Sequence, residues 1–253
     1  MRFAFWLVLL TAFGCTGEDA TLRMVLPKAL KEVSGLANYE GDLLAIADER
    51  GRIYRISFSN ESVERVGAFG DPPVKGDFEG IAVSADTVFA VTSKGVLYSK
   101  NLDEPDDAFD SVDTGIGELC EIEGLHWHNQ LLYILCKTPY ADDLKKHLAI
   151  FAWDPRTKQR VTEQDFQLSW RQFELSKEKI HPSGLLVTED MFFVIAAREK
   201  VWLKVNRRTN ETTSGRLSSS HDQAEGIAIQ DGATYIADEG SKRGTVTRYE
   251  GVI

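Results

Sequence analysis

The sequence is poor in cysteine and in basic residues, and it lacks several familiar catalytic motifs. Its 253 residues contain 3 Cys, and 29 Lys and Arg stand against 39 Asp and Glu, which gives a net charge of −10. This acidic balance argues against nucleic acid as a partner and offers nothing to anionic lipid headgroups, whereas it suits cations. No phosphate-binding loop or dinucleotide fingerprint is present, and no Gly-x-Ser-x-Gly elbow indicates a serine hydrolase.

The N-terminus carries an apolar run with the pattern of an export signal. Met1-Arg2 is followed by the apolar residues 3–13, which are too few to span a bilayer as a helix, and then by Gly14-Cys15. This pattern predicts a lipoprotein signal peptide over residues 1–14, a lipidated Cys15 and a polar tether over residues 15–21. The alternatives are a plain cleaved signal and an uncleaved anchor.

The predicted lipid fixes the expected location. We expect a bacterial cell-envelope protein that contacts the membrane through the lipid on Cys15. Because Thr16 rather than Asp follows the cysteine, we expect the outer membrane, with the periplasm or the cell surface as the alternative.

The other two cysteines form an even pair in an oxidising compartment if the protein is exported. Cys120 and Cys136 flank the repeat motif at Glu123, whose first two predicted strands, residues 122–128 and 131–137, form a hairpin that brings the two cysteines near each other. A disulfide and two buried free thiols both remain open. Neither cysteine has the basic surroundings of a catalytic nucleophile.

Five copies of a short motif divide the chain into repeats. In each copy a small or acidic residue and then a glycine precede Leu or Ile at the start of a stretch of alternating hydrophobic residues. The glycines are Gly35, Gly80, Gly124, Gly184 and Gly226, at spacings of 45, 44, 60 and 42 residues. A period of about 40–45 residues made of short strands is typical of a propeller blade. The 60-residue spacing predicts polar insertions in the third repeat, at 138–147 and 171–180.

Strand alternation gives the number of blades. Each of the first four repeats contains four predicted strands, such as 35–39, 43–47, 52–57 and 63–69 in the first. The last repeat has room for only three, and the missing strand is predicted at residues 22–26. The sequence therefore predicts an all-β fold, a single five-bladed β-propeller domain over residues 22–253, closed by an N-terminal strand that joins the last blade.

Acidic residues recur at equivalent places in the repeats. Glutamate precedes the repeat glycine in three copies, at Glu79, Glu123 and Glu225, where the innermost strands of a propeller would start at one mouth of its channel. Acidic pairs follow the second strand of the first and last repeats. Because that strand runs antiparallel to the first, we expect these pairs in the same basin; they are Asp48, Glu49, Asp238 and Glu239.

Carboxylates gathered in this way must bind a cation, pair with basic residues or raise their pKa values. Two of them about 6 Å apart repel each other by roughly 3 kcal/mol at an effective dielectric constant near 20. Two alternatives follow. One is a hard cation with oxygen ligands, for which Ca²⁺ fits better than Zn²⁺ or Cu²⁺. The other is a salt-bridged ring neutralised by Lys94, Lys137 and Arg198 at the ends of the second strands.

A resemblance to a known family favours Ca²⁺ over the salt-bridged ring. The blade starts, together with residues 43–49, 51–56 and 76–82, resemble the SdiA-regulated (YjiK-like) family over about residues 25–250. The resemblance implies a five-bladed propeller, distantly similar to the six-bladed NHL-repeat and strictosidine-synthase-like proteins, with a bound Ca²⁺ and a hydrolase activity. By position, Glu79, Glu123 and Glu225 match the glutamate of the family's blade-start motif, whereas Ser34 and Ser183 take the serine form.

Two functions of different classes follow from these observations. The first is an exported, lipid-anchored Ca²⁺-binding propeller that hydrolyses an ester, a lactone or a phosphoester, with the ion as Lewis acid and Glu123 or His221 as the catalytic base. The second is a non-enzymatic module that binds a small molecule or a cell-envelope ligand, with Ca²⁺ structural or absent; the fold does not decide between them. His181 is a further acid–base candidate, while His126 and His128 share a strand face without an obvious third zinc ligand.

Overall fold

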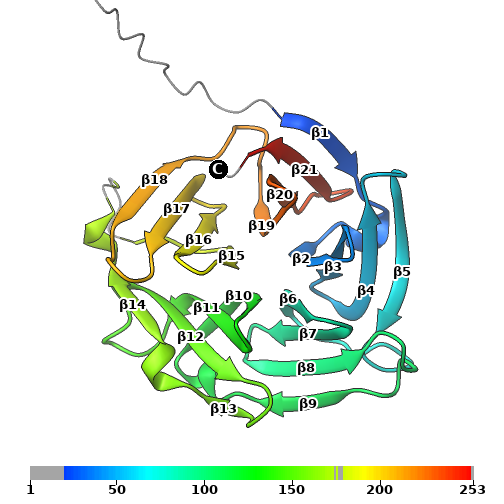
Figure 1. Ribbon diagram of the computed structural model, residues 1–253, viewed down its shortest axis with the longest axis horizontal. Coiled ribbons are helices and arrows are strands. Elements are labelled where there is room, and N and C mark those ends of the chain that lie inside the picture. Colours follow the sequence, from blue (N-terminus) through cyan, green and yellow to red (C-terminus); the bar gives the residue numbers. More distant parts are fainter. Residues whose placement is uncertain (1–19, 174, 176–178, 252–253) are drawn as a thin grey trace, which may run out of the picture.

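The computed structural model describes residues 20–251 apart from 174 and 176–178. Its strands form five small antiparallel sheets arranged in a ring around a central axis (Figure 1). The predicted five-bladed β-propeller is therefore confirmed. Among the helices of this described part, none is long and apolar enough to cross a membrane. The predicted signal peptide and Cys15 lie outside the described residues.

In the first four blades the strands follow one another in the chain from the axis outward. The first blade contains β2 (Val33–Tyr39), β3 (Asp42–Ala47), β4 (Arg50–Ser57) and β5 (Ser62–Ala68). The second contains β6 (Phe78–Ser84), β7 (Thr87–Thr92), β8 (Val96–Asn101) and β9 (Asp110–Asp113). The third contains β10 (Cys120–His128), β11 (Leu131–Pro139), β12 (His147–Asp154), β13 (Gln159–Arg160) and β14 (Phe166–Ser169). The fourth contains β15 (Gly184–Val187), β16 (Met191–Ala196), β17 (Val201–Asn206) and β18 (Thr212–Arg216). Short 3-10 turns are η1 (Lys28–Leu30), η2 (Ile116–Glu118), η3 (Thr162–Gln164) and η4 (Trp170–Gln172).

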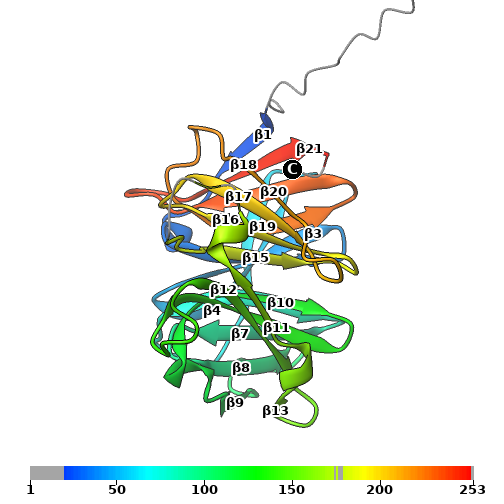
Figure 2. The same cartoon turned by 90° about the vertical axis from the view of Figure 1, so that its left-hand side faces the viewer.

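The fifth blade is built from both ends of the chain. It contains β19 (Ala224–Gln230), β20 (Ala233–Asp238), β21 (Thr245–Glu250) and, on its outside, β1 (Ala20–Val25). β1 pairs antiparallel with β21, with Met24 opposite Val246, and the two strands lie side by side in both views (Figure 1, Figure 2). This confirms the predicted closure of the ring by an N-terminal strand. The closure covers an edge of β21 that would otherwise be exposed.

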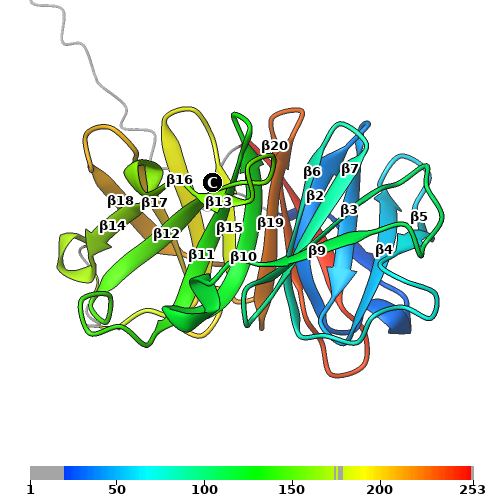
Figure 3. The same ribbon diagram turned by 90° about the horizontal axis from the view of Figure 1, so that it is seen from below.

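Glycine at the start of the inner strands allows neighbouring blades to approach closely at the axis. A Cβ atom on Gly80 would lie 2.6 Å from the backbone nitrogen of Leu125 in the next blade, and one on Gly35 would lie 3.0 Å from that of Ile81. Any larger side chain would push these strands apart. Packing therefore favours the repeat glycine strongly at Gly80 and Gly35, whereas a Cβ atom on Gly124 would lie 3.3 Å from its nearest neighbour. The inner strands stand upright around the central axis (Figure 3).

The second strand of each blade is buried on both faces. Residues 43–47 of β3 and all six residues of β20 are buried, because neighbouring blades pack against both sides of each sheet. Such strands are continuous apolar runs rather than strict alternations. Side chains of adjacent blades form the core together, as where Phe89 of β7 packs with Leu125 and Phe151 of the third blade.

The long third repeat differs in part from the sequence prediction. Residues 140–146 connect β11 to β12, within the predicted insertion at 138–147, and η4 stands at the start of the predicted insertion at 171–180. A further extension was not predicted. Residues 155–165 between β12 and β14 contain β13 and η3, and both β13 and β14 pair with β12.

Cys120 and Cys136 are two buried free thiols. A hydrogen bond between their side chains, followed by burial, raises the pKa of the Cys136 thiol far above its usual value. The two side chains are thus close enough to interact, and the disulfide stays a prediction. Both cysteines belong to the core between the second and third blades.

Candidate functional site

An irregularity in four inner strands aims the residue before the repeat glycine at the channel mouth. In β2, β6, β10 and β19 the pairing with the second strand skips one residue just before the glycine. The skipped residues are Ser34, Glu79, Glu123 and Glu225. A β-bulge of this kind takes a side chain out of the regular alternation, and it is a common device for aiming a residue at a functional site.

The three bulged glutamates, of which Glu123 is buried and Glu79 and Glu225 are half-buried, lie close enough to one another to interact. Burial, followed by the charge of Glu123, raises the pKa of Glu79 to about 9 and that of Glu225 to about 8. Burial also raises the pKa of Glu123 to about 7, although the attraction of Lys137 opposes the rise. At neutral pH Glu79 and Glu225 therefore hold protons that the same side chains would release in water, whereas Glu123 is divided between its protonated and charged forms.

Lys137, from the end of β11, provides the positive charge nearest to these acids. Its ammonium group forms an ion pair with Oε1 of Glu123, whose side chain is 4% exposed. Burial opposes the charged form of Lys137, but Glu123 and the other two glutamates outweigh it and raise the pKa of the ammonium group. Oε2 of Glu123 is buried and has no hydrogen-bond partner in the described structure. We call Glu79, Glu123, Glu225 and Lys137 the mouth cluster.

The two Ala-Asp-Glu segments are shifted by one residue relative to each other. Gly35 pairs with Ile46, whereas Gly226 pairs with Ala237. Asp238 therefore corresponds in place to Ala47, and Glu239 corresponds to Asp48. In the third blade Gly124 pairs with Leu135, so Lys137 corresponds in place to Asp48 and Glu239. Identical sequence thus puts the two acidic pairs in different positions, because side chains alternate along a strand.

In each Ala-Asp-Glu segment, one of the two acids interacts with the charges near the channel mouth: Asp48 in the first blade and Glu239 in the fifth. Burial, followed by the charge of Glu32, raises the pKa of Asp48 to about 6, and Glu239 contributes to that rise. The same two leading causes raise the pKa of Glu239, which also accepts a hydrogen bond from the amide of Gln223. Asp48 and Glu239 therefore border the mouth cluster, while Glu49 has an exposed side chain.

Asp238 instead forms a buried network with His221. Oδ2 of Asp238 lies 2.6 Å from Nδ1 of His221, and Nε2 of His221 lies 2.6 Å from the hydroxyl oxygen of Tyr249. The exposed fractions of the three residues are 3%, 2% and 4%. Both ring nitrogens of His221 are thus engaged inside the fifth blade, and the ring is enclosed by protein.

A cavity of about 330 Å³ opens beside the mouth cluster, across the third, fourth and fifth blades. It is lined by Glu123, Lys137, His181, Ser183, Ala197, Arg198, Asp222, Gln223 and Glu225. Ser183 accepts a hydrogen bond from the backbone nitrogen of Ala197 at 3.0 Å and donates to the carbonyl of Ala224 at 2.6 Å. This serine therefore joins two blades and is engaged in structural hydrogen bonds.

His181 presents an oriented imidazole to this cavity. Its Nδ1 lies 3.0 Å from Oε1 of Glu199, whose other oxygen accepts the backbone N–H of His181 at 3.0 Å. A guanidinium nitrogen of Arg198 lies 3.3 Å from Nε2. Because a guanidinium group can only donate, Nε2 is the acceptor and Nδ1 carries the proton. The arrangement places a basic nitrogen at the cavity and a buried carboxylate behind it.

The sequence contained a signal for this histidine but not for its partner. A polar residue stands at the same place before the glycine in every repeat: Glu32, Asp77, Glu121, His181 and Gln223. A systematic comparison of this position would have pointed to the mouth. Glu199 was missed, because its fourth-blade segment differs from the two Ala-Asp-Glu segments.

The remaining candidates lie elsewhere or play smaller parts. His126 and His128 lie in the second half of β10, and burial, followed by the charge of His128, lowers the pKa of His126 to about 4. Nε2 of His128 lies 3.4 Å from a carboxylate oxygen of Glu189. Of the three basic residues expected to neutralise the mouth, Lys137 pairs with Glu123, Arg198 contacts His181, and Lys94 is exposed.

The channel mouth contains oxygen atoms of the kind that bind Ca²⁺, but these atoms are not gathered into a complete set of ligands. Oε2 of Glu123 and Oδ1 of Asp48 are buried oxygens that have no hydrogen-bond partner in the described structure. They are hard ligands of the type that Ca²⁺ prefers. Within the described ranges, however, no three His, Cys, Asp or Glu side chains are gathered as a metal-binding group. Ca²⁺ therefore stays a prediction, supported by donor chemistry.

Comparison with solved structures supports the fold. The chain is similar to Myxococcus xanthus glutaminyl cyclase, with 13% identity, a TM-score of 0.61, and coverage of 93% of this chain and 97% of that one. It is similar to a PQQ-bound aldose sugar dehydrogenase from Streptomyces coelicolor, with 13% identity, a TM-score of 0.56, and coverage of 92% and 99%. A luciferin-regenerating enzyme gives 10% identity, a TM-score of 0.56, and coverage of 91% and 96%. No family model and no curated protein matches the sequence, so the resemblance to the SdiA-regulated family stays a prediction.

Proposed function

We propose that the channel mouth binds Ca²⁺ through the carboxylates of Glu79, Glu123 and Glu225. The observation that carries this proposal is an excess of carboxyl groups over basic partners. Three carboxyl groups in and around the channel mouth share one nearby ammonium group, that of Lys137, and the pKa values of Glu79, Glu123 and Glu225 are raised to about 9, 7 and 8. A divalent cation would take over the role of the protons that now relieve the repulsion. Its binding should therefore release protons and strengthen as the pH rises.

We further propose that this mouth hydrolyses an ester, a lactone or a phosphoester. Bound Ca²⁺ would supply Lewis-acid polarisation of a substrate oxygen. With a pKa of about 7 in the metal-free protein, Glu123 would act as the general acid–base group in the state where Glu79 and Glu225 alone hold the ion. His181 offers Nε2 to the same cavity and is oriented by Glu199. The enclosed position of His221 favours a positioning role for that residue within the fifth blade.

Export and lipid anchoring belong to the same proposal. The pattern of residues 1–15 supports a lipoprotein of the bacterial outer membrane, with the periplasm or cell surface as the alternative. Replacement of Cys15 by serine should abolish incorporation of a labelled fatty acid and release the protein from the membrane fraction. If Cys15→Ser still incorporates the labelled fatty acid, the proposal of a lipid anchor on Cys15 is wrong.

The second candidate function is a non-enzymatic binding module of the cell envelope. The ion pair of Lys137 with Glu123 favours it, because an acidic ring neutralised by a lysine needs no metal. The fold hosts both kinds of function. The two candidates are separated by the following tests.

Calcium binding is tested by thermal unfolding with Ca²⁺ or with a chelator. At a Ca²⁺ concentration about 100 times the dissociation constant, binding should add roughly 2.7 kcal/mol to the free energy of unfolding. In a chain of this size each kcal/mol raises Tm by roughly 2–4 °C. Glu79→Gln and Glu123→Gln should lose this increment, and Glu64→Gln, on the exposed side of β5, should keep it. If the wild type has the same Tm with Ca²⁺ and with chelator, the proposal that it binds Ca²⁺ is wrong.

Hydrolysis is tested with a panel of chromogenic esters, lactones and phosphoesters in the presence of Ca²⁺. We expect turnover that Glu123→Gln and His181→Gln each reduce by about 100-fold or more, as for loss of a general acid–base group. Glu199→Gln should shift the pH profile, since it changes the group that orients the imidazole. Absence of turnover above the Glu123→Gln background across the panel supports the binding module instead.

A further inference from the structure

A second cavity lies away from the mouth cluster, between the third and fourth blades. Its volume is about 830 Å³, and it is lined by the β10–β11 turn, the β15–β16 turn and the start of the β17–β18 turn. The inner strands run from the mouth to these turns, so the cavity opens on the opposite face. One wall is the extension between β12 and β14, which is the part of the long third repeat that the other blades lack.

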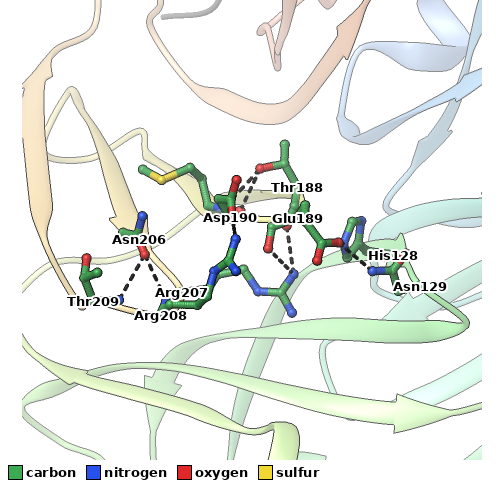
Figure 4. A network of polar contacts seen from close by, with 10 residues as sticks. His128, Asn129, Thr188, Glu189, Asp190, Asn206, Arg207, Arg208 and Thr209 are labelled. Carbon is green, nitrogen blue, oxygen red and sulfur yellow. Dashed lines mark hydrogen bonds and ion pairs between the residues drawn. The ribbon is translucent and has the colours of Figure 1, made fainter.

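Arg207 occupies the floor of this cavity in a fixed orientation. The carbon of its guanidinium group lies 5.0 Å from the ring centres of both Tyr133 and Phe192. The group donates hydrogen bonds to the carbonyl of Thr188 at 2.8 Å, to the hydroxyl of Tyr133 at 2.6 Å and, at 3.4 Å, to the carbonyl of Glu189. Figure 4 shows Arg207 held beneath the β15–β16 turn, between Arg208 and the side chains of the β10–β11 turn.

The guanidinium group of Arg207 donates its hydrogen bonds to neutral oxygens. Its charge also acts on Glu189, whose pKa is lowered first by a hydrogen bond from Asn129 and further by this charge. In the described part of the chain, Arg207 forms no ion pair within 4.0 Å, and its three bonds leave two of the five N–H groups of a guanidinium group for a ligand. Asp165 is paired with Arg160, and Asp154 with Arg156. Glu189 accepts a hydrogen bond from Asn129 at 2.8 Å.

The walls of the cavity combine flat apolar surface with amide groups. Trp127 and Phe166 are half-buried at the cavity, and each is braced from behind by a second ring. Trp127 stacks on Phe89 with a centroid distance of 5.7 Å, and the ring of Phe166 lies 4.9 Å from that of Phe192. The exposed amides of Gln130 and Gln164 stand at the rim. Apolar walls with a few placed polar groups are typical of small-molecule sites.

We propose that this cavity binds a small organic carboxylate with a flat apolar body, such as an aromatic acid. The carboxylate would accept the two remaining N–H groups of Arg207 in a bidentate contact, which is stronger and more specific than a contact with a neutral group. The flat body would lie between Trp127 and Phe166. A dianionic phosphate fits less well, because Asp154, Glu163 and Glu189 also line the cavity and would repel the second charge. The site is separate from the mouth cluster and does not depend on the function proposed for it.

Benzoate is the probe for this site, and its neutral counterpart is benzyl alcohol. Titration of the ¹⁵N-labelled protein should move the indole N–H signal of Trp127, assigned with Trp127→Phe, while that of Trp170, in the core of the third and fourth blades, stays in place. Arg207→Gln should weaken benzoate binding by about tenfold or more through loss of the charged contact, and benzyl alcohol should bind the wild type more weakly by a similar factor.

Arg216→Gln is the matched control, because Arg216 is an exposed arginine of the same blade and does not line this cavity. It should bind benzoate as the wild type does. If Arg207→Gln does not fold, Arg207→Lys keeps the charge, loses the bidentate geometry and should still weaken binding severalfold. The proposal is overturned if millimolar benzoate leaves the Trp127 signal unmoved, if benzyl alcohol or inorganic phosphate binds as well as benzoate, or if folded Arg207 variants bind normally.

Discussion

Glu79 and Glu225 show how burial changes the proton balance of single residues at the channel mouth. Their pKa values are raised to about 9 and about 8, chiefly by burial and then by the charge of Glu123. In the unfolded chain the same groups would titrate near 4.5. Between these limits the folded state therefore holds more protons than the unfolded state, so the free energy of unfolding must fall as the pH rises.

The first prediction concerns the metal-free protein in chelator. Its Tm should fall between pH 5 and pH 9, the window set by the raised pKa of Glu79 and the ordinary value of a glutamate. Glu79→Gln should flatten this dependence, because an amide does not titrate. Glu64→Gln, at an exposed position of β5, should keep the slope of the wild type. A Tm that rises across this window would contradict the burial of the cluster.

The second prediction concerns His221. Removal of its ring by His221→Leu leaves the carboxylate of Asp238 buried without its partner, so we expect a loss of about 3–5 kcal/mol in the free energy of unfolding. Urea denaturation measures this loss. Asp222→Asn, at the exposed neighbouring position, should stay within about 0.5 kcal/mol of the wild type. A His221 variant of normal stability would show that the network is not structural.

At the scale of strands, the repeat pattern predicted the ring better than it predicted the mouth. Blade number and closure follow from spacing and from counting strands, so the sequence alone was sufficient for both. The place of Asp238 did not follow, because Ala-Asp-Glu occurs one residue earlier relative to the glycine in the fifth blade than in the first. One residue of shift exchanges the two faces of a strand. The contact of His181 with Glu199 depends on a loop conformation that no periodicity encodes.

The third prediction concerns β1. Deletion of residues 1–26 should expose the edge of β21 and cause loss of stability and self-association, which light scattering and urea denaturation would detect. Deletion of residues 1–19 leaves β1 in place and should change neither property. Equal behaviour of the two truncated proteins would contradict the role of β1 in closing the ring.

The fourth prediction concerns the close approach of blades at the axis. Gly80→Ala places a methyl group 2.6 Å from the backbone nitrogen of Leu125, and we expect a loss of about 1–3 kcal/mol in the free energy of unfolding from the overlap. Gly67→Ala is the matched control in β5, because its nearest neighbour would lie at an ordinary 3.6 Å. Similar stability of the two variants would show that the inner strands have room to move apart.

At the scale of the whole molecule, the propeller carries two different chemistries on its two faces. One mouth gathers acids around Lys137, and the opposite face holds Arg207 over aromatic rings beside the extension of the third blade. The three solved structures named above are similar in fold at identities of 10–13%, so the function has to be found in these residues. The acidic mouth is the feature that the repeat itself produces, because the bulge before the glycine recurs from blade to blade.

Calorimetric titration with Ca²⁺ near pH 7.5, in two buffers of different ionisation enthalpy, measures the number of protons released for each bound ion. If the ion replaces the protons held by Glu79, Glu123 and Glu225, we expect roughly one to two protons released per Ca²⁺, and fewer for Glu79→Gln. Binding without proton release, or no binding heat in either buffer, would contradict the claim that these buried carboxyl groups form a cation site.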